Sequence, residues 1–286
     1  MRRNPEWRVL RAAAVMVVFA ASTASAGYLL VDKEGNQTLV SKGRVKSLSE
    51  DGQGPQAVFD LGRARAWMSN PEQNVYWEGT IDELCASIRE TAAAMSKSAQ
   101  QAMEEQIARL PTEQRAKLEE LRKTMAEKRA AAEQEERSKP GVIKIERTAE
   151  TATIAGQPTR KYRVLVDGKL YREDWLSTDA SLAEEFALDR ASALMSRVSA
   201  CVDSGGPPSA RGKGVDEGEI YRELYPHGWP LKEVSYRSGE ATPKSEMGKI
   251  EKRDVPDGEF KPPPGYRKTT LREVMFSGMG NGLPTR

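Results

Sequence analysis

The clearest indication of the fold is the stretch TRKYRVLVDGKLYREDWL, residues 159–176. At its centre is Asp167-Gly168, a dipeptide typical of the two-residue turn of a β-hairpin, because both residues tolerate a positive φ. On either side of the turn, β-branched and aromatic residues alternate with charged ones. This alternation predicts two antiparallel strands with one face toward the core and the other toward solvent.

Pairing the strands across this turn assigns each side chain to a face. The predicted pairs are Val166 with Lys169, Val164 with Tyr171, Tyr162 with Glu173, and Arg160 with Trp175. Paired residues share a face of the sheet. The apolar face then collects Tyr162, Val164, Val166, Tyr171 and Trp175. The charged face collects Lys161, Arg163, Arg172 and Asp174 around Leu165 and Leu170.

Outside the hairpin, the chain alternates between short strand patterns and helical patterns. Apolar or alternating runs bounded by turn residues predict strands at 28–31, 38–40, 57–61, 75–77, 142–145, 231–236 and 247–253. An amphipathic helix is predicted over 180–201, and a flexible glycine-rich loop over 203–218. This order predicts an α+β fold dominated by one antiparallel sheet.

A charged helical insertion, residues 81–137, separates the early strands from the later ones. Thr80 and Glu83 have the spacing of a capping box, which predicts the start of a helix. Pro111 must break the helix, because its ring cannot continue the preceding turn. Apolar residues are sparse: Met103, Ile107 and Leu110 before the break, then Leu118, Leu121 and Met125 after it. We therefore expect a helical arm that projects into solvent or packs only lightly.

The first 26 residues have the three parts of a secretory signal peptide. Arginines precede an apolar run at 12–21, and Ala24-Ser25-Ala26 is a cleavage sequence of small residues before Gly27. The apolar run is shorter than the ~20 residues that a spanning helix needs. We expect cleavage between Ala26 and Gly27, no stable membrane span afterwards, and a periplasmic or secreted protein. The expected mature chain is a single domain over 27–276 with a disordered tail at 277–286.

The charge balance bears on the class of partner. The whole chain has 44 basic and 42 acidic residues, and the signal peptide carries four arginines and one glutamate. The mature chain would then have 40 basic and 41 acidic residues. Without a basic excess to neutralise phosphates, nucleic acid is not an expected partner.

Two cysteines, Cys85 and Cys201, remain after the predicted cleavage. An isolated even pair in an oxidising compartment predicts a disulfide. The alternative is that both are unrelated small buried residues.

Residues that carry catalytic chemistry are few. The single histidine, His227, lies in a Pro/Gly sequence, so a structural role is expected for it. One histidine and two distant cysteines cannot supply a typical zinc site, and no phosphate-binding glycine loop is present. We expect no metal, cofactor or catalytic residue, and hence a protein that is not an enzyme.

Several short motifs resemble a bacterial exported family known as domain of unknown function 4412. They are residues 43–46, 58–61, 70–78, 154–162, 167–169 with Trp175, 230–231, 255–257 and 260–266. Such families look like the LolA/LolB and LppX group of envelope proteins. The resemblance implies a half-barrel, which is a curved antiparallel sheet with helices in its concave face. It implies no catalytic residue.

Three functional hypotheses follow. In the first, the protein carries an apolar ligand, such as an acyl chain, on the concave face, with helix 180–201 as a lid. The ligand-binding residues would be Phe59, Tyr162, Val164, Val166, Tyr171 and Trp175. In the second, that face is a filled core, and the protein is an envelope interaction protein or scaffold that docks a partner through its arm. The third hypothesis is an unidentified envelope enzyme. An apolar face looks the same in sequence whether it lines a pocket or a core.

Overall fold

The computed structural model describes residues 25–50, 54–138, 141–205, 215–237 and 239–276, with the backbone alone at 25–26, 129–138 and 202–205. Residues 1–24 of the predicted signal peptide and the tail at 277–286 lie outside the described residues, as does most of the predicted loop 203–218. No helix in the described part of the chain is long and apolar enough to cross a membrane.

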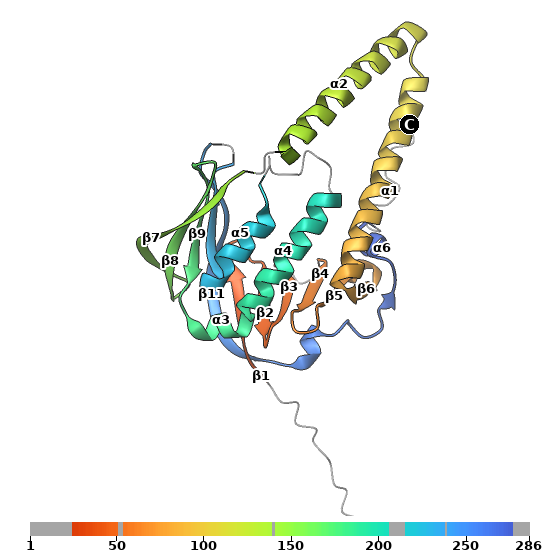
Figure 1. Ribbon diagram of the computed structural model, residues 1–286. Helices are drawn as coiled ribbons and strands as arrows, with labels where there is room; N and C mark the ends of the chain where they lie inside the picture. The colour runs from red at the N-terminus through yellow and green to blue at the C-terminus, as the bar shows by residue number, and fades with distance from the viewer. Residues whose placement is uncertain (1–24, 51–53, 139–140, 206–214, 238, 277–286) are drawn as a thin grey trace, which may run out of the picture.

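One open, curved sheet of twelve strands organises the described chain, so the predicted α+β class is confirmed (Figure 1). The strand order is β12-β6-β5-β4-β3-β2-β1-β11-β10-β9-β8-β7, and every neighbouring pair is antiparallel except β12 with β6. The strands are β1 Ser25–Asp32, β2 Gln37–Ser41, β3 Arg44–Leu48, β4 Gln56–Asp60, β5 Arg65–Asn70, β6 Val75–Thr80, β7 Ile143–Ile154, β8 Gln157–Val166, β9 Lys169–Ser177, β10 Pro230–Ser235, β11 Thr242–Val255 and β12 Arg267–Lys268.

Two-residue turns join β2 to β3 and β8 to β9, so that strands consecutive in the chain pair with each other. Lys42 and Gly43, which join β2 to β3, both have positive φ angles of 51° and 71°. Asp167 and Gly168, which join β8 to β9, have 51° and 76°. Two successive positive φ angles give the turn whose twist matches that of the flanking strands. The predicted hairpin at Asp167-Gly168 is therefore confirmed.

The predicted cleavage point lies inside β1. Cleavage after Ala26 would leave the strand from Gly27 onward paired with β11 and β2. Gly27 sits so close to β2 that a Cβ atom there would lie 2.4 Å from the carbonyl oxygen of Val40. Only glycine fits this approach without a shift of the backbone.

Six α-helices lie in the described residues: α1 Ile81–Ala108, α2 Thr112–Ser138, α3 Ala180–Phe186, α4 Leu188–Gly205, α5 Glu217–Leu224 and α6 Leu271–Phe276. The Thr80–Glu83 capping box is present, and the break at Pro111 separates α1 from α2 as predicted. The single helix predicted over 180–201 is instead two helices, because Ala187 adopts a left-handed conformation with φ 46°. Helix α5 begins within the predicted loop 203–218, where Asp216 caps it by accepting from the backbone N–H of Glu219.

Helices α3, α4 and α5 cover one face of the sheet, which we call the concave face (Figure 1). Leu182 and Phe186 of α3, and Ile220 and Leu224 of α5, are fully buried against it. The ring of Phe186 stacks on that of Trp229, with centroids 3.7 Å apart. Side chains from these helices therefore form the main core.

A smaller core lies on the opposite, convex face. Residues 257–260 form the 3₁₀ helix η4, and its Phe260 packs with Trp67 and Val58 of the sheet. The indole N–H of Trp67 donates to the carbonyl oxygen of Phe260 at 2.8 Å. This contact fixes the C-terminal segment across β3, β4 and β5.

The predicted disulfide between Cys85 and Cys201 is confirmed, with Cα atoms 5.2 Å apart. It joins the first turns of α1 to the end of α4. Ile81 and Leu84 are buried beside it. The base of α1 is thus part of the core, and the remainder of α1 with α2 forms the projecting arm (Figure 1).

Candidate binding sites

The register predicted for the β8–β9 hairpin is wrong beyond Leu165 and Leu170. A β-bulge places both Tyr171 and Arg172 opposite Val164, so every later pair is shifted by one residue. Tyr162 is opposite Asp174 rather than Glu173, and Trp175 is opposite Lys161. Because a shift of one residue exchanges the two faces, the predicted division of β9 into an apolar and a charged face fails.

The six predicted ligand-binding residues do not form one surface. Tyr162 and Val164 are buried under α5, where Tyr171 is half-buried beside them. Val166 is half-buried near the turn. Phe59 packs in a different cluster, with residues of β5, β6 and α1. Trp175 lies on the other face, with the ammonium groups of Lys161 and Lys232 4.9 Å and 5.2 Å from its ring centroid.

The concave face is occupied by side chains where an apolar ligand was expected. Leu176 and Leu231 from the sheet are fully buried under the helices. A ligand on this face would have to displace α3, α4 or α5. The carrier hypothesis therefore requires a movement of these helices, and it stays a prediction.

The bulge also buries two charges that were predicted to face solvent. Arg172 and Asp174 are 3% and 1% exposed. The guanidinium Nε donates to Asp174 Oδ2 at 2.8 Å, and Nη1 lies 3.4 Å from Glu217 Oε2 and 3.8 Å from Glu233 Oε2. We call Arg172, Asp174, Glu217 and Glu233 the buried charge cluster; it links β9, β10 and α5.

The pKa of one carboxylate of this cluster, Asp174, is shifted from its usual value. Burial raises the pKa of Asp174 to about 6, and the nearby carboxylates of Glu233 and Glu217 act in the same direction. The opposing attraction of Arg172 is too small to compensate. The Oδ1 atom of Asp174 is buried without a hydrogen-bond partner. The Tyr171 hydroxyl donates to Glu217 at 2.5 Å, and burial with this carboxylate raises the pKa of Tyr171.

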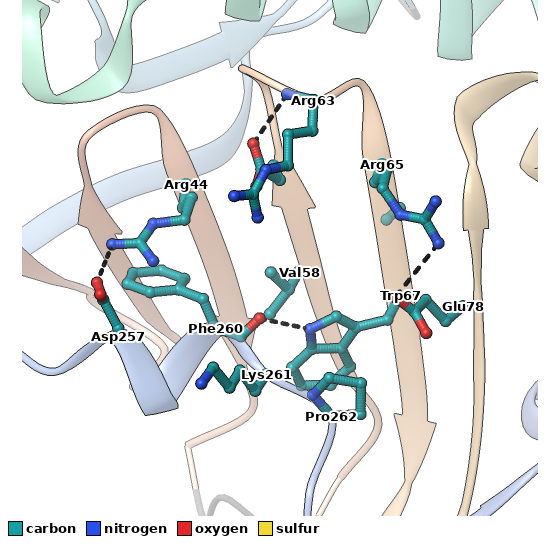
Figure 2. A pocket seen from close by; sticks show the side chains of 12 residues that line it. Arg44, Val58, Arg63, Arg65, Trp67, Glu78, Asp257, Phe260, Lys261 and Pro262 are labelled. Carbon is teal, nitrogen blue, oxygen red and sulfur yellow. Dashed lines mark hydrogen bonds and ion pairs between the residues drawn. The ribbon is translucent and has the colours of Figure 1, made fainter.

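A cleft of about 330 Å³ opens on the convex face beside η4 (Figure 2). Its floor is apolar, with Val58, Trp67, Phe260 and Pro262. Three arginines on its walls are already paired with acidic residues: Arg44 with Asp257 at 2.7 Å, Arg65 with Glu78 at 3.3 Å, and Arg63 with Asp60 at 3.7 Å. These three pairs neutralise one another, and Lys261 adds one further positive charge to the lining of the cleft.

A second hollow, of about 280 Å³, lies between strand β7 and helix α5. It is lined by Ile143, Ile145, Arg147, Tyr162, Glu219, Glu223 and His227. The imidazole of His227 stacks on the ring of Tyr162 with centroids 5.2 Å apart. Among the described residues, no group of three His, Cys, Asp or Glu side chains could hold a metal ion.

The arm exposes large apolar side chains. Met95 and Met103 of α1 are each 49% exposed, and Leu121 and Met125 of α2 are 57% and 62% exposed. Of the apolar residues predicted along the arm, only Ile107 is buried in the described structure. The prediction of a projecting arm with a thin apolar stripe therefore agrees with the structure.

No family model and no curated protein matches this chain. A solved structure of PNGF-II in a C2 space group aligns with 90% of this chain and 32% of its own, at 12% identity and a TM-score of 0.37. The chain thus spans about a third of that protein, and so weak a likeness carries no argument about fold or function. The resemblance to domain of unknown function 4412 stays a prediction.

Proposed function

We propose that the protein is an exported, non-enzymatic binding protein that docks a partner polypeptide through its helical arm. The observation that carries this proposal is the row of exposed methionine and leucine side chains on α1 and α2. The disulfide between Cys85 and Cys201 supports export, because such bonds persist in oxidising compartments.

One apolar stripe runs along α1 from the core into the arm. Leu84 and Cys85 are buried in the sheet domain, and the same side of α1 then carries Met95 and Met103 into solvent. Isolated exposed apolar residues are common on protein surfaces, but a row of them along a helix marks an interaction site. Methionine is frequent at such sites because its flexible side chain adapts to different partners.

The charges on α2 restrict the class of partner. On a helix of 3.6 residues per turn, Lys117, Arg122 and Lys128 flank the Leu118–Leu121–Met125 stripe. Glu119, Glu120 and Glu127 lie on the opposite side, together with Lys123. A helix that packs on the stripe would place its own flanking residues beside these cations. The partner that fits is therefore an amphipathic helix with acidic residues beside its apolar face.

Binding can be tested with a defined probe. We expect a synthetic amphipathic helical peptide with leucines on one face and glutamates beside them to bind the purified protein in fluorescence anisotropy. A peptide with lysines in place of the glutamates should bind at least about tenfold more weakly. The double variant Leu121→Ser with Met125→Ser should lose binding, whereas Glu127→Ser, on the opposite side of α2, should retain it.

Photo-crosslinking in the native envelope extends this test. A photoreactive amino acid placed at Leu121 should give a discrete product that the same amino acid at Glu127 does not give. Equal binding of the two peptides would contradict the proposal. So would binding to phosphatidylglycerol vesicles in place of the acidic peptide, since a basic amphipathic helix also suits an anionic membrane surface.

A further inference from the structure

We propose that strand β7 is the dimerisation edge of this protein, and that its occupant is β7 of a second copy. Strand β7 is the last strand in the sheet order, and Figure 1 shows it at the rim of the sheet. Its outer backbone N–H and C=O groups have no strand beside them in the described chain. Such an edge is a template for pairing with another strand.

The usable part of this edge is short and regular. Residues 143–147 pair continuously with β8, and then residues 148–150 bulge out opposite the single residue Lys161. A bulge bends the strand and ends regular pairing at that point. The edge that a second strand can join is therefore Ile143–Arg147, with Lys144 and Glu146 on the convex face and the other three residues on the concave face.

Lys144 and Glu146 favour pairing of this edge with a second copy, in one particular register. In an antiparallel pair, residues opposite each other must lie on the same face. Centring the two-fold axis on Ile145 places Lys144 opposite Glu146 of the partner subunit, and Glu146 opposite the partner's Lys144. A shift of two residues in either direction would instead oppose two Lys144 or two Glu146 side chains. Like charges directly opposite one another destabilise a strand pair.

The same register also uses the hollow between β7 and α5. It places Arg147 of the partner subunit opposite Ile143, beside the wall that Glu219 and Glu223 of α5 provide. The half-buried Ile145 meets the partner's Ile145 at the axis. The hollow, which this chain's own Arg147 also lines, thus gains a second cation and an apolar residue from the second copy, and the two-fold axis does the same for the equivalent hollow of that copy.

Sedimentation velocity across a concentration series tests the dimer. We expect a reversible monomer–dimer equilibrium. Lys144→Glu should raise the dissociation constant at least about tenfold, because it sets glutamates opposite each other twice. The exchanged variant Lys144→Glu with Glu146→Lys should restore it. The single variant also breaks the exposed Lys144–Glu146 contact within one strand, so thermal unfolding must show that the monomer remains folded.

Cysteine crosslinking tests the register directly. Opposed residues of antiparallel strands have Cα atoms ~4.5–5.5 Å apart, within the range that a disulfide spans. Ile145→Cys should therefore give a covalent dimer under mild oxidation, and Thr153→Cys, exposed at the far end of β7, should not. A protein that stays monomeric at ~100 μM, where a dimer with a dissociation constant of ~1 μM would be almost fully formed, would overturn the proposal. So would a dimer that is indifferent to Lys144→Glu and does not crosslink at Ile145→Cys.

Discussion

The two ends of this molecule distribute charged and apolar side chains in opposite ways. Where α5 meets β9, the sheet buries Arg172 and Asp174. On the arm, the helices expose Met103, Leu121 and Met125. Charged side chains are rarely buried unless they are paired, and an exposed apolar row is costly unless something covers it. The buried charges at the first end find their partners within the chain, whereas the apolar side chains of the arm are left uncovered by the described residues.

The difference follows from which elements meet in each region. At the sheet end, three carboxylates from β9, β10 and α5 converge on one guanidinium. In the arm, α1 and α2 diverge from the break at Pro111, so neither helix covers the other along most of its length (Figure 1). Substitutions at the sheet end should therefore cost more stability than substitutions in the arm.

Removing the disulfide should have the largest effect on stability. The double variant Cys85→Ser with Cys201→Ser opens a loop between residues 116 positions apart. The chain-entropy model gives a loss of ~4–5 kcal/mol for a loop of this length, and measured losses are often smaller. Urea denaturation should show a lower midpoint, and reduction of the unaltered protein should reproduce it. An unchanged midpoint would mean that α1 and α4 hold together without the bond.

Breaking the buried charge cluster should cause the second-largest loss of stability. Arg172→Met leaves Asp174, Glu217 and Glu233 close together without their shared cation, which should cost ~3–5 kcal/mol of unfolding free energy. Arg163→Met is the matched control on the other face of the hairpin, since the Arg163 side chain is 43% exposed. The control should cost under ~1 kcal/mol. Equal losses for the two variants in urea denaturation would refute the special role of Arg172.

Local patterns predicted the turns and caps but not the bulge. The Asp167-Gly168 turn and the Thr80–Glu83 capping box depend on neighbouring residues only, so the sequence was sufficient for both. The extra residue at Tyr171–Arg172 depends on what lies across the sheet. Arg172 can be buried because Glu217, 45 residues away, reaches it. The alternation of apolar and charged residues in the hairpin contains no sign of Glu217, and it therefore predicts that Arg172 faces solvent.

Strand β3 and helix α5, which the sequence analysis does not predict, also depend on contacts with distant parts of the chain. Strand β3 contains Arg44 and Lys46, and so it does not resemble a core strand. Lys46 is nevertheless buried, because its ammonium group pairs with Glu259 at 3.0 Å from a distant part of the chain. Helix α5 is short and follows a glycine-rich stretch. Helix α5 is buried because it packs on apolar residues of β7, β8 and β9. These residues are distant in sequence, so no local pattern predicts the contact.

The titration of Asp174 should give a smaller, pH-dependent effect. Its pKa is raised to about 6 in the folded protein, against ~3.9 in an unfolded chain. The folded state therefore binds this proton more tightly, and the resulting stabilisation is complete below pH ~4 and is lost as the pH rises through about 6. The expected size is ~1–3 kcal/mol. Unfolding free energies of the native protein and Asp174→Asn, compared from pH 4 to 8, should show the native protein gaining stability relative to the variant as the pH falls. A constant difference would show that Asp174 does not titrate in this range.

The smallest effect on stability is expected in the arm. Met103→Ser and Leu121→Ser alter side chains that are 49% and 57% exposed, and surface substitutions usually change stability by less than ~0.5 kcal/mol. Leu84→Ala is the matched change within α1, because Leu84 is 1% exposed in the core. It should cost ~2–5 kcal/mol. If Met103→Ser destabilised the isolated protein as much as Leu84→Ala, the arm would be held by internal packing. A near-zero cost means that the folded chain does not need these side chains for itself, which is what a docking surface requires.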